Sequence, residues 1–158
     1  MTAEKTYKPW SAGQEKFGKR FIKRIGKWQT FVYEKTNGKL WNTFLGAPCA
    51  ILTTIGRKSG EPRKTPLLYM REGNDVVMVA SQGGFSTMPL WYRNIQANPE
   101  VSIQIGAEKR QMRAREASES EKTLLWPKLD AIYEGYKEYR ARTEGIRDIP
   151  ILIFSAID

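Results

Sequence analysis

The chain has 158 residues, of which 41% are hydrophobic and 27% are charged, so it is long enough to form one globular domain with a buried core. Its formal net charge of +9 indicates an anionic partner, such as nucleic acid, an acidic membrane surface or a phosphorylated small molecule. The sequence contains no histidine, which excludes Ser-His-Asp and Cys-His nucleophile chemistry and any His-ligated metal site.

Cysteine usage and hydropathy favour a cytoplasmic protein. The single cysteine, Cys49, cannot form an internal disulfide and opens an apolar run, where a small buried thiol is expected. No apolar run approaches the roughly 20 residues that span a bilayer. The N-terminus also lacks the apolar segment of a secretory signal peptide.

The first predicted elements are a flexible polar arm over residues 1–13 and an amphipathic helix over residues 14–35. Apolar side chains recur at spacings of three and four along one face of this helix: Phe17, Phe21, Ile22, Ile25, Trp28 and Val32. Cations occupy the opposite face: Lys16, Lys19, Arg20, Lys23, Arg24 and Lys27. Two interpretations stay open. The apolar face packs on the domain's own core, as in most such helices, or the helix makes peripheral contact with the inner face of the cell membrane.

A hairpin is predicted over residues 50–70, where two extended runs flank a Gly/Ser/Gly/Pro turn. Four cations surround this turn: Arg57, Lys58, Arg63 and Lys64. Glycines allow backbone N–H groups to approach a ligand closely, and converging N–H donors and cations form an anion site. A solvated basic turn is the alternative interpretation of the same residues.

A second anion cradle is predicted at residues 81–84, Ser-Gln-Gly-Gly, which directly follow a strand predicted over residues 76–80. A short helix is predicted over residues 89–98, and free N–H groups and the helix dipole both favour negative charge at such a start. Gly-Gly alone is a weak signal, because it is usually only a turn. Two cradles in one short chain make a phosphorylated ligand more plausible.

Two strands over residues 101–105 and 109–116 come next, followed by a helical segment that a Ser118-x-x-Glu121 capping box begins. A last strand is predicted over residues 149–154. This order of elements predicts an α+β fold, in which an antiparallel barrel carries helices on its outside. We expect a single domain over residues 14–158.

Three tyrosines, Tyr133, Tyr136 and Tyr139, are spaced by three in the second half of this helical segment, and we expect them on one side of a helix. Such a stripe packs on the core, or it forms a wall around a ring-shaped ligand. The spacing alone does not choose between the two.

Four motifs, in this order, resemble the deazaflavin-dependent nitroreductase family. They are L-T-T-x-G-R-K-S-G-x-P-R-x-T-P-L (52–67), A-S-x-G-G (80–84), P-x-W-Y-x-N-x-x-A-N-P (89–99) and the tyrosines that precede I-P-I (149–151). The resemblance covers roughly residues 14–155. It implies a split β-barrel, a fold in which related proteins bind FMN, and the reduced deazaflavin coenzyme F420 as the cofactor.

The resemblance also implies roles for residues of this sequence. The hairpin is expected to bind the coenzyme's phosphate and acidic tail through Arg57, Lys58, Ser59, Arg63, Lys64, Thr65 and Pro66. The next loop is expected to contact the coenzyme's phosphate and ring region through Ser81, Gln82, Gly83 and Gly84. The short helix after it is expected to line the coenzyme groove with Trp91 and Tyr92. The catalytic residues are expected to be Tyr133, Tyr136 and Ser81, with Tyr139 beside them.

One position departs from the family pattern. Many relatives carry Ser-Lys-Gly-Gly where this chain has Gln82. Loss of that cation should weaken the hold on an anion by the ~1.5–3 kcal/mol of one charge-assisted contact. Lys64 is a candidate to compensate for it.

A hydride-donating coenzyme needs a protein that binds, orients and excludes water, so the lack of histidine is no obstacle. A tyrosine hydroxyl is suited to hydrogen-bond the acceptor's oxygen as charge develops there. We expect a quinone as the acceptor, with nitroaromatics reduced adventitiously and no nucleic acid as partner. The alternatives are an FMN-binding split-barrel oxidoreductase, and a non-catalytic basic barrel that binds a membrane surface or nucleic acid.

Overall fold

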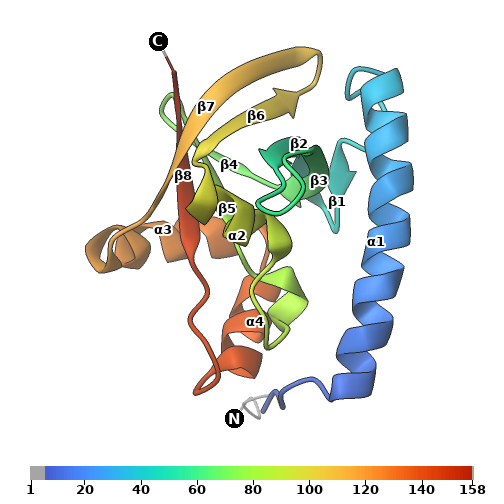
Figure 1. Cartoon of the computed structure of the whole chain (residues 1–158). Coiled ribbons are helices and arrows are strands. Elements are labelled where there is room, and N and C mark those ends of the chain that lie inside the picture. Colours follow the sequence, from blue (N-terminus) through green and yellow to red (C-terminus); the bar gives the residue numbers. More distant parts are fainter. Residues whose placement is uncertain (1–5, 158) are drawn as a thin grey trace.

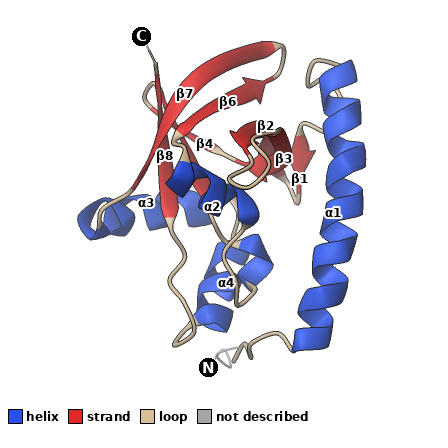
Figure 2. Cartoon of the chain, in the orientation of Figure 1, coloured by secondary structure: helices blue, strands red, loops and turns tan. Residues whose placement is uncertain are grey.

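The computed structural model describes residues 6–157, which form a curled antiparallel sheet with helices around it (Figures 1 and 2). The strands are β1 (Thr43–Phe44), β2 (Ala47–Ile55), β3 (Pro62–Leu68), β4 (Met70–Glu72), β5 (Asp75–Val79), β6 (Glu100–Ile105), β7 (Glu108–Glu116) and β8 (Ile151–Ala156). The helices are α1 (Ala12–Lys35), the short 3-10 helix η1 (Gln82–Gly84), α2 (Leu90–Ala97), α3 (Glu119–Ile132) and α4 (Gly135–Thr143).

The strand order β1-β2-β6-β7-β8-β5-β4, with β3 also paired to β2, is that of a split β-barrel. Each strand pair is antiparallel, and the β2–β3 pairing runs from Cys49 opposite Leu68 to Ile55 opposite Pro62. The predicted α+β split-barrel fold is therefore confirmed.

Two hydrophobic clusters lie on the two faces of the curled sheet. The cluster inside the curl contains Leu52, Met78, Ile103, Met112 and Phe154. The cluster outside it joins β5 and β8 to α3 and α4, and it contains Val77, Ile151, Ile153, Leu129 and Tyr136. Because β5 and β8 are covered on both faces, their sequences are continuous apolar runs.

Some predicted boundaries differ in the structure. The run over residues 63–70 is divided between β3 and β4, because the chain leaves β2 at Tyr69 and pairs with β5 from Met70 onward. The connector expected at 39–48 contains β1 and the start of β2. Tyr133 caps the C-terminus of α3 instead of lying within a helix, since α4 begins only at Gly135.

The chain before α1 makes specific contacts, whereas a flexible arm was expected there; residues 1–5 lie outside the described residues. The indole Nε1 of Trp10 donates to the carbonyl of Gly83 at 2.9 Å. The guanidinium of Arg142 donates to the carbonyl of Lys8 and lies 3.8 Å from the centre of the Trp10 ring. This segment is therefore attached to both η1 and α4.

The apolar face of α1 does not pack on the core. Phe17 is 73% exposed and Trp28 is 65% exposed, and Phe21, Ile22 and Ile25 are exposed as well. The interpretation that this face covers the domain's own core is therefore wrong. In the described part of the chain, no helix has the length and apolar character needed to cross a membrane.

Polar contacts set the rotation of α1 about its axis. Its buried residues are Glu15, Gln29, Thr30 and Tyr33. The Tyr33 hydroxyl accepts a hydrogen bond from the Gly106 amide at 2.8 Å. Lys64 of β3 pairs with Glu34 at 2.6 Å. With these groups turned toward the barrel, the aromatic face is left in solvent.

Candidate active site

The β2–β3 turn is held by its own backbone and by α2. The amide of Gly56 donates to the carbonyl of Glu61, and the amide of Gly60 donates to the carbonyl of Gly56, each at 2.8 Å. The buried Asn94 of α2 accepts from the amide of Arg57 at 3.2 Å and donates to the hydroxyl of Thr54 at 3.0 Å. Asn94 belongs to the P-x-W-Y-x-N motif, yet the sequence analysis assigned it no role.

The cations predicted to converge on this turn divide into two groups. Arg57, Lys58 and Arg63 stay exposed at the turn, and Arg63 donates to the Ser59 hydroxyl at 3.3 Å. Lys64 instead binds Glu34 of α1, because adjacent residues of a strand point to opposite faces. The suggestion that Lys64 compensates for Gln82 is therefore not supported by its position.

Of the two hairpin residues that follow Lys64, Pro66 lies beneath α1. Thr65 and Pro66 are both partly buried. A Cβ added to Gly26 of α1 would lie 3.6 Å from the Pro66 ring, so the glycine brings the helix close to β3 at this point. These positions shape the surface beside the turn.

The 81–84 loop has an unusual backbone. Gln82, Gly83 and Gly84 take φ values of 43°, 63° and 77°, in the left-handed region. A Cβ on Gly84 would lie 3.1 Å from the Cα of Tyr139, so only glycine permits this approach to α4. Within residues 6–157, the buried Oε1 of Gln82 has no hydrogen-bond partner. The loop is therefore a tight turn of the kind that can cradle an anion.

The predicted tyrosines form one cluster beside this loop. The hydroxyls of Tyr133 and Tyr139 are 2.8 Å apart, and the rings of Tyr133 and Tyr136 are 5.0 Å apart. Burial raises the pKa of Tyr136 and Tyr139 above the ordinary value, and the hydrogen bond to Tyr133 raises that of Tyr139 further. Both phenols are therefore protonated at neutral pH and can donate hydrogen bonds.

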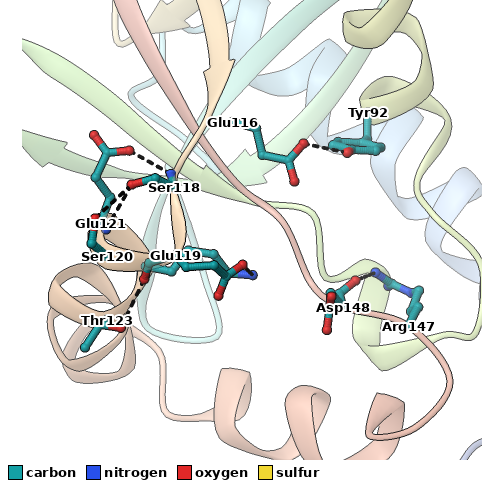
Figure 3. A network of polar contacts seen from close by, with 10 residues as sticks. Tyr92, Glu116, Ser118, Glu119, Ser120, Glu121, Thr123, Arg147 and Asp148 are labelled. Carbon is teal, nitrogen blue, oxygen red and sulfur yellow. Dashed lines mark hydrogen bonds and ion pairs between the residues drawn. The ribbon is translucent and has the colours of Figure 1, made fainter.

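Trp91 and Tyr92 were expected to line a groove, but the structure buries both side chains inside the curl of the sheet. The Tyr92 hydroxyl donates to Glu116 at 2.8 Å, as Figure 3 shows. Burial first, and then this carboxylate, raise the pKa of Tyr92 to about 12. The contact between α2 and the hairpin turn is therefore made by Asn94, and not by Trp91 or Tyr92.

Helix α1 links the two cradles. It lies along the side of the molecule that carries β3, the 81–84 loop and α4 (Figure 1). A Cβ on its Gly18 would meet the ring of Phe85 just after the loop, while Gly26 lies against Pro66. Folding therefore brings the loop and the tyrosines into direct contact, and it joins the hairpin to them through α1.

A split barrel with a left-handed glycine loop next to buried, protonated tyrosines has features suited to a cofactor-dependent oxidoreductase. The sequence model of the F420H(2)-dependent quinone reductase family matches residues 25–155. This chain belongs to that family, so it is an F420-dependent oxidoreductase and its cofactor is the deazaflavin coenzyme F420. The predicted family and cofactor are confirmed.

Relatives of known sequence support the assignment. An F420H(2)-dependent quinone reductase of Mycobacterium tuberculosis is 34% identical over 128 residues, which are 78% of this chain and 85% of that protein. Another relative from the same organism is 41% identical over 106 residues, which are 67% of this chain and 87% of that protein.

Solved structures agree with the sequence comparisons. An F420-H2 dependent reductase is 38% identical with a TM-score of 0.63, covering 72% of this chain and 98% of that one. A domain-swapped dimer is 33% identical with a TM-score of 0.64, covering 87% and 98%. A Listeria innocua structure of the pyridoxamine 5′-phosphate oxidase type covers 70% of this chain and 84% of that one, and at 13% identity and a TM-score of 0.50 it shows the fold alone.

The residues of this chain fit such a cofactor. Phosphate and carboxylate groups need cations and N–H donors. The turn offers the exposed Arg57, Lys58 and Arg63, and the left-handed loop offers backbone N–H donors. The donor set thus matches an anionic coenzyme with a flat ring.

Proposed function

We propose that this protein transfers a hydride from reduced F420 to an apolar acceptor, with a quinone as the physiological acceptor and nitroaromatics as adventitious ones. The observation that carries this proposal is the contact between the 81–84 loop and the tyrosine cluster. Gly84 lies against Tyr139, and Tyr139 is hydrogen-bonded to Tyr133. A cofactor in the cradle would therefore have phenols beside it.

The cradle and the hairpin would bind and orient the coenzyme. Arg57, Lys58 and Arg63 would hold its anionic groups, and Ser81 and Gly83 would hold the part nearer the ring. When bound, F420 supplies the hydride. The protein's part is then to position the acceptor and keep water away from it.

The tyrosines would act on the acceptor's oxygen. Reduction of a quinone by a hydride leaves negative charge on oxygen, and a hydrogen-bond donor stabilises that charge as it forms. Tyr136 suits this role because its phenol is buried and, with its raised pKa, stays protonated. Tyr133 and the Ser81 hydroxyl are the other candidate hydrogen-bond donors. A proton passed from one of them, and replaced on it by a proton from solvent, would complete the hydroquinone.

The first experiment is a titration with oxidised F420 and, in parallel, with FMN, followed by tryptophan fluorescence. We expect saturable binding of F420 and weak binding of FMN. A preference for FMN would leave the barrel intact and contradict the choice of coenzyme. Binding of neither would contradict the site.

The role of the tyrosines is tested on the enzyme that binds F420. We expect a Tyr133→Phe, Tyr136→Phe variant to bind the coenzyme normally and to reduce a quinone more slowly. Full quinone turnover by this variant would remove the tyrosines from the mechanism. Turnover of a nitroaromatic in the same assay compares the two acceptor classes.

We further propose that α1 holds this protein, as a cytoplasmic protein, on the inner face of the cell membrane. Phe17, Phe21 and Trp28 form an exposed apolar face whose contact with water is energetically unfavourable, and a membrane surface would cover it. The same helix carries the exposed cations Arg20, Lys23 and Arg24, so the surface would be an anionic one. Quinones with apolar tails are dissolved in the same membrane.

Co-sedimentation with vesicles tests this contact. We expect binding to vesicles that contain anionic phospholipid, and loss of binding in a Phe17→Ser, Phe21→Ser variant. Leu124→Ser is the matched control, because Leu124 is 71% exposed on α3, away from α1. Equal binding of the wild type and the two variants would contradict the proposal.

A dimer is the alternative occupant of this face. If the molecular mass of the wild type in solution doubles as its concentration rises, and only the α1 variant stays at the monomer mass, the face binds a second copy of the chain instead of a membrane.

A further inference from the structure

A single arginine holds the 81–84 loop from its inner side. Arg147 lies in the segment between α4 and β8, and its guanidinium donates to the carbonyls of Ser81 and Phe85 at 2.8 Å each. It also donates to the carbonyl of Ala80 at 3.2 Å. The loop therefore has carbonyls at its start and at its end bound to one side chain. None of the motifs found in the sequence includes this residue.

The charge of Arg147 is left without a close acidic partner. It belongs to none of the ion pairs that residues 6–157 form, and its contact with Asp148 is to the backbone carbonyl (Figure 3). Burial lowers the pKa of its guanidinium, while the charge of Glu15 raises it. An arginine remains protonated in proteins, so a positive charge stays behind a loop that has no cation of its own.

Part of the loop's backbone turns its N–H groups away from this arginine, while the amides of Gly84 and Phe85 donate to the carbonyls of Ser81 and Gln82 within the loop. In a planar trans peptide, the N–H points opposite to the C=O. The carbonyls of Ala80, Ser81 and Phe85 point at Arg147, so the amides that follow them point away from it. One of these amides shows what the outer side binds: the amide and hydroxyl of Ser86 bind the carboxylate of Glu15 at 2.7 and 2.9 Å.

We propose that Arg147 is a positioning residue for the coenzyme, which fixes the 81–84 loop with the N–H groups of Ser81 and Gln82 outward and places a positive charge behind them. The proposal rests on the proposed function for the identity of the ligand. Arg147 itself does not touch the coenzyme in this role. It acts through the backbone of Ser81 and Phe85.

The test compares four variants with the wild type: Arg147→Gln, Arg147→Lys, the double variant Arg147→Gln, Gln82→Lys, and Arg140→Gln. Arg140 is the matched control, because its guanidinium donates two hydrogen bonds to Asp130 and lies over Trp126, with none of its hydrogen bonds in the described part of the chain going to the loop. Four measurements are made: the Kd for oxidised F420, the kcat and KM for quinone reduction by reduced F420, the urea midpoint of unfolding, and the NMR resonance of the Trp10 indole N–H. This N–H donates to Gly83, so it reports the shape of the loop without coenzyme.

We expect Arg147→Gln to raise the Kd and the KM for F420 about tenfold or more, the size of a lost contact to a charged group. Its kcat at saturating coenzyme should change little, and the Trp10 resonance should shift. Arg147→Lys should recover part of the affinity. Gln82→Lys in the double variant should restore affinity through charge while the Trp10 resonance stays shifted. Arg140→Gln should lower the urea midpoint alone.

The proposal is overturned if Arg147→Gln keeps both the wild-type affinity and the wild-type Trp10 resonance, or if Arg140→Gln loses as much affinity. If Arg147→Gln does not fold, Arg147→Lys decides, because unchanged affinity and resonance in that variant overturn the proposal equally. Failure of the wild type to bind F420 is a different result, which overturns the proposed function.

Discussion

Helices α1 and α3 look alike in sequence and face opposite ways. Each has apolar residues at helical spacing, and each begins with a capping box, Ser11 with Gln14 and Ser118 with Glu121. Yet α1 turns its aromatic residues to solvent, while α3 and α4 turn theirs to the sheet. In Figure 1, α1 stands along one side of the barrel and α3 crosses its other side.

The difference comes from the surface that each helix meets. The outer faces of β5 and β8 present Val77, Val79, Ile151 and Ile153, so α3 and α4 cover them with apolar residues. The surface under α1 offers Lys64, Pro66 and the backbone of Gly106, so α1 meets it with polar residues and glycines. Helical periodicity therefore predicts the helix, and the partner surface decides which face is buried.

The largest effect is expected when one apolar side chain is removed from each of the two helices. Leu129 of α3 is 2% exposed, so Leu129→Ala should lower the free energy of unfolding by about 2–5 kcal/mol. Phe17→Ala on α1 removes a larger side chain, but from solvent, so the change should stay within about 0.5 kcal/mol. Urea unfolding measures both. Similar losses in the two variants would mean that the aromatic face of α1 is packed in solution.

A smaller effect is expected where α4 meets the 81–84 loop. Gly84→Ala places a Cβ 3.1 Å from the Cα of Tyr139 at a φ of 77°, and a strained position of this kind costs about 1–3 kcal/mol. Gly46→Ala is the control, since Gly46 has a φ of 79° and nothing near its Cβ. We expect both to destabilise the fold, and only Gly84→Ala to weaken F420 binding as well. If both variants lost F420 binding, the loss would not depend on the close contact between Gly84 and α4.

The looser packing of α1 predicts a gain of stability instead of a loss. A Cβ on Gly26 would lie 3.6 Å from Pro66, an ordinary contact distance, and its φ is not in the left-handed region. Gly26→Ala should therefore raise the free energy of unfolding by about 0.5–1 kcal/mol, because alanine is the better helix former. Urea unfolding measures it. A lower stability would show that α1 is packed as tightly on β3 as α3 is on β8.

Sequence alone predicted the features that depend on neighbouring residues. The capping box at Ser118, the apolar runs of β5 and β8 and the glycine turn at residues 81–84 are all local patterns. The direction in which α1 faces is not local, because it depends on β3 and on Gly106. The contact that Lys64 makes was not predicted for the same reason: its partner Glu34 lies thirty residues earlier in the chain.

The candidate site was predictable to a similar extent. Family motifs identified the loop and the tyrosines, and the structure places them in contact. The family resemblance placed Trp91 and Tyr92 in the groove, because a motif assigns a helix to the groove without telling its groove side from its core side; both side chains lie in the core. Arg147 carries no motif at all, and only the fold brings it to Ser81, 66 residues earlier.

The smallest predicted effect separates the two capping boxes by pH. Glu121 at the start of α3 accepts from the guanidinium of Arg115 and from the Ser118 amide, the second of which Figure 3 shows. These bonds lower its pKa from the ordinary 4.5 to about 2. A carboxylate with a lowered pKa stabilises the fold fully above its ordinary pKa, and that contribution disappears as the pH falls from 4.5 toward 2. Gln14 at the start of α1 is neutral, so its bonds to Ser11 carry no such dependence on pH.

Thermal unfolding between pH 6 and about 2 tests this difference. The Glu121→Gln variant should lose less stability on acidification than the wild type, and Gln14→Glu should make the stability of α1 sensitive to acid. Identical pH profiles for the wild type and Glu121→Gln would mean that the α3 cap is not a charged one in solution, and the two helices would then differ in their packing alone.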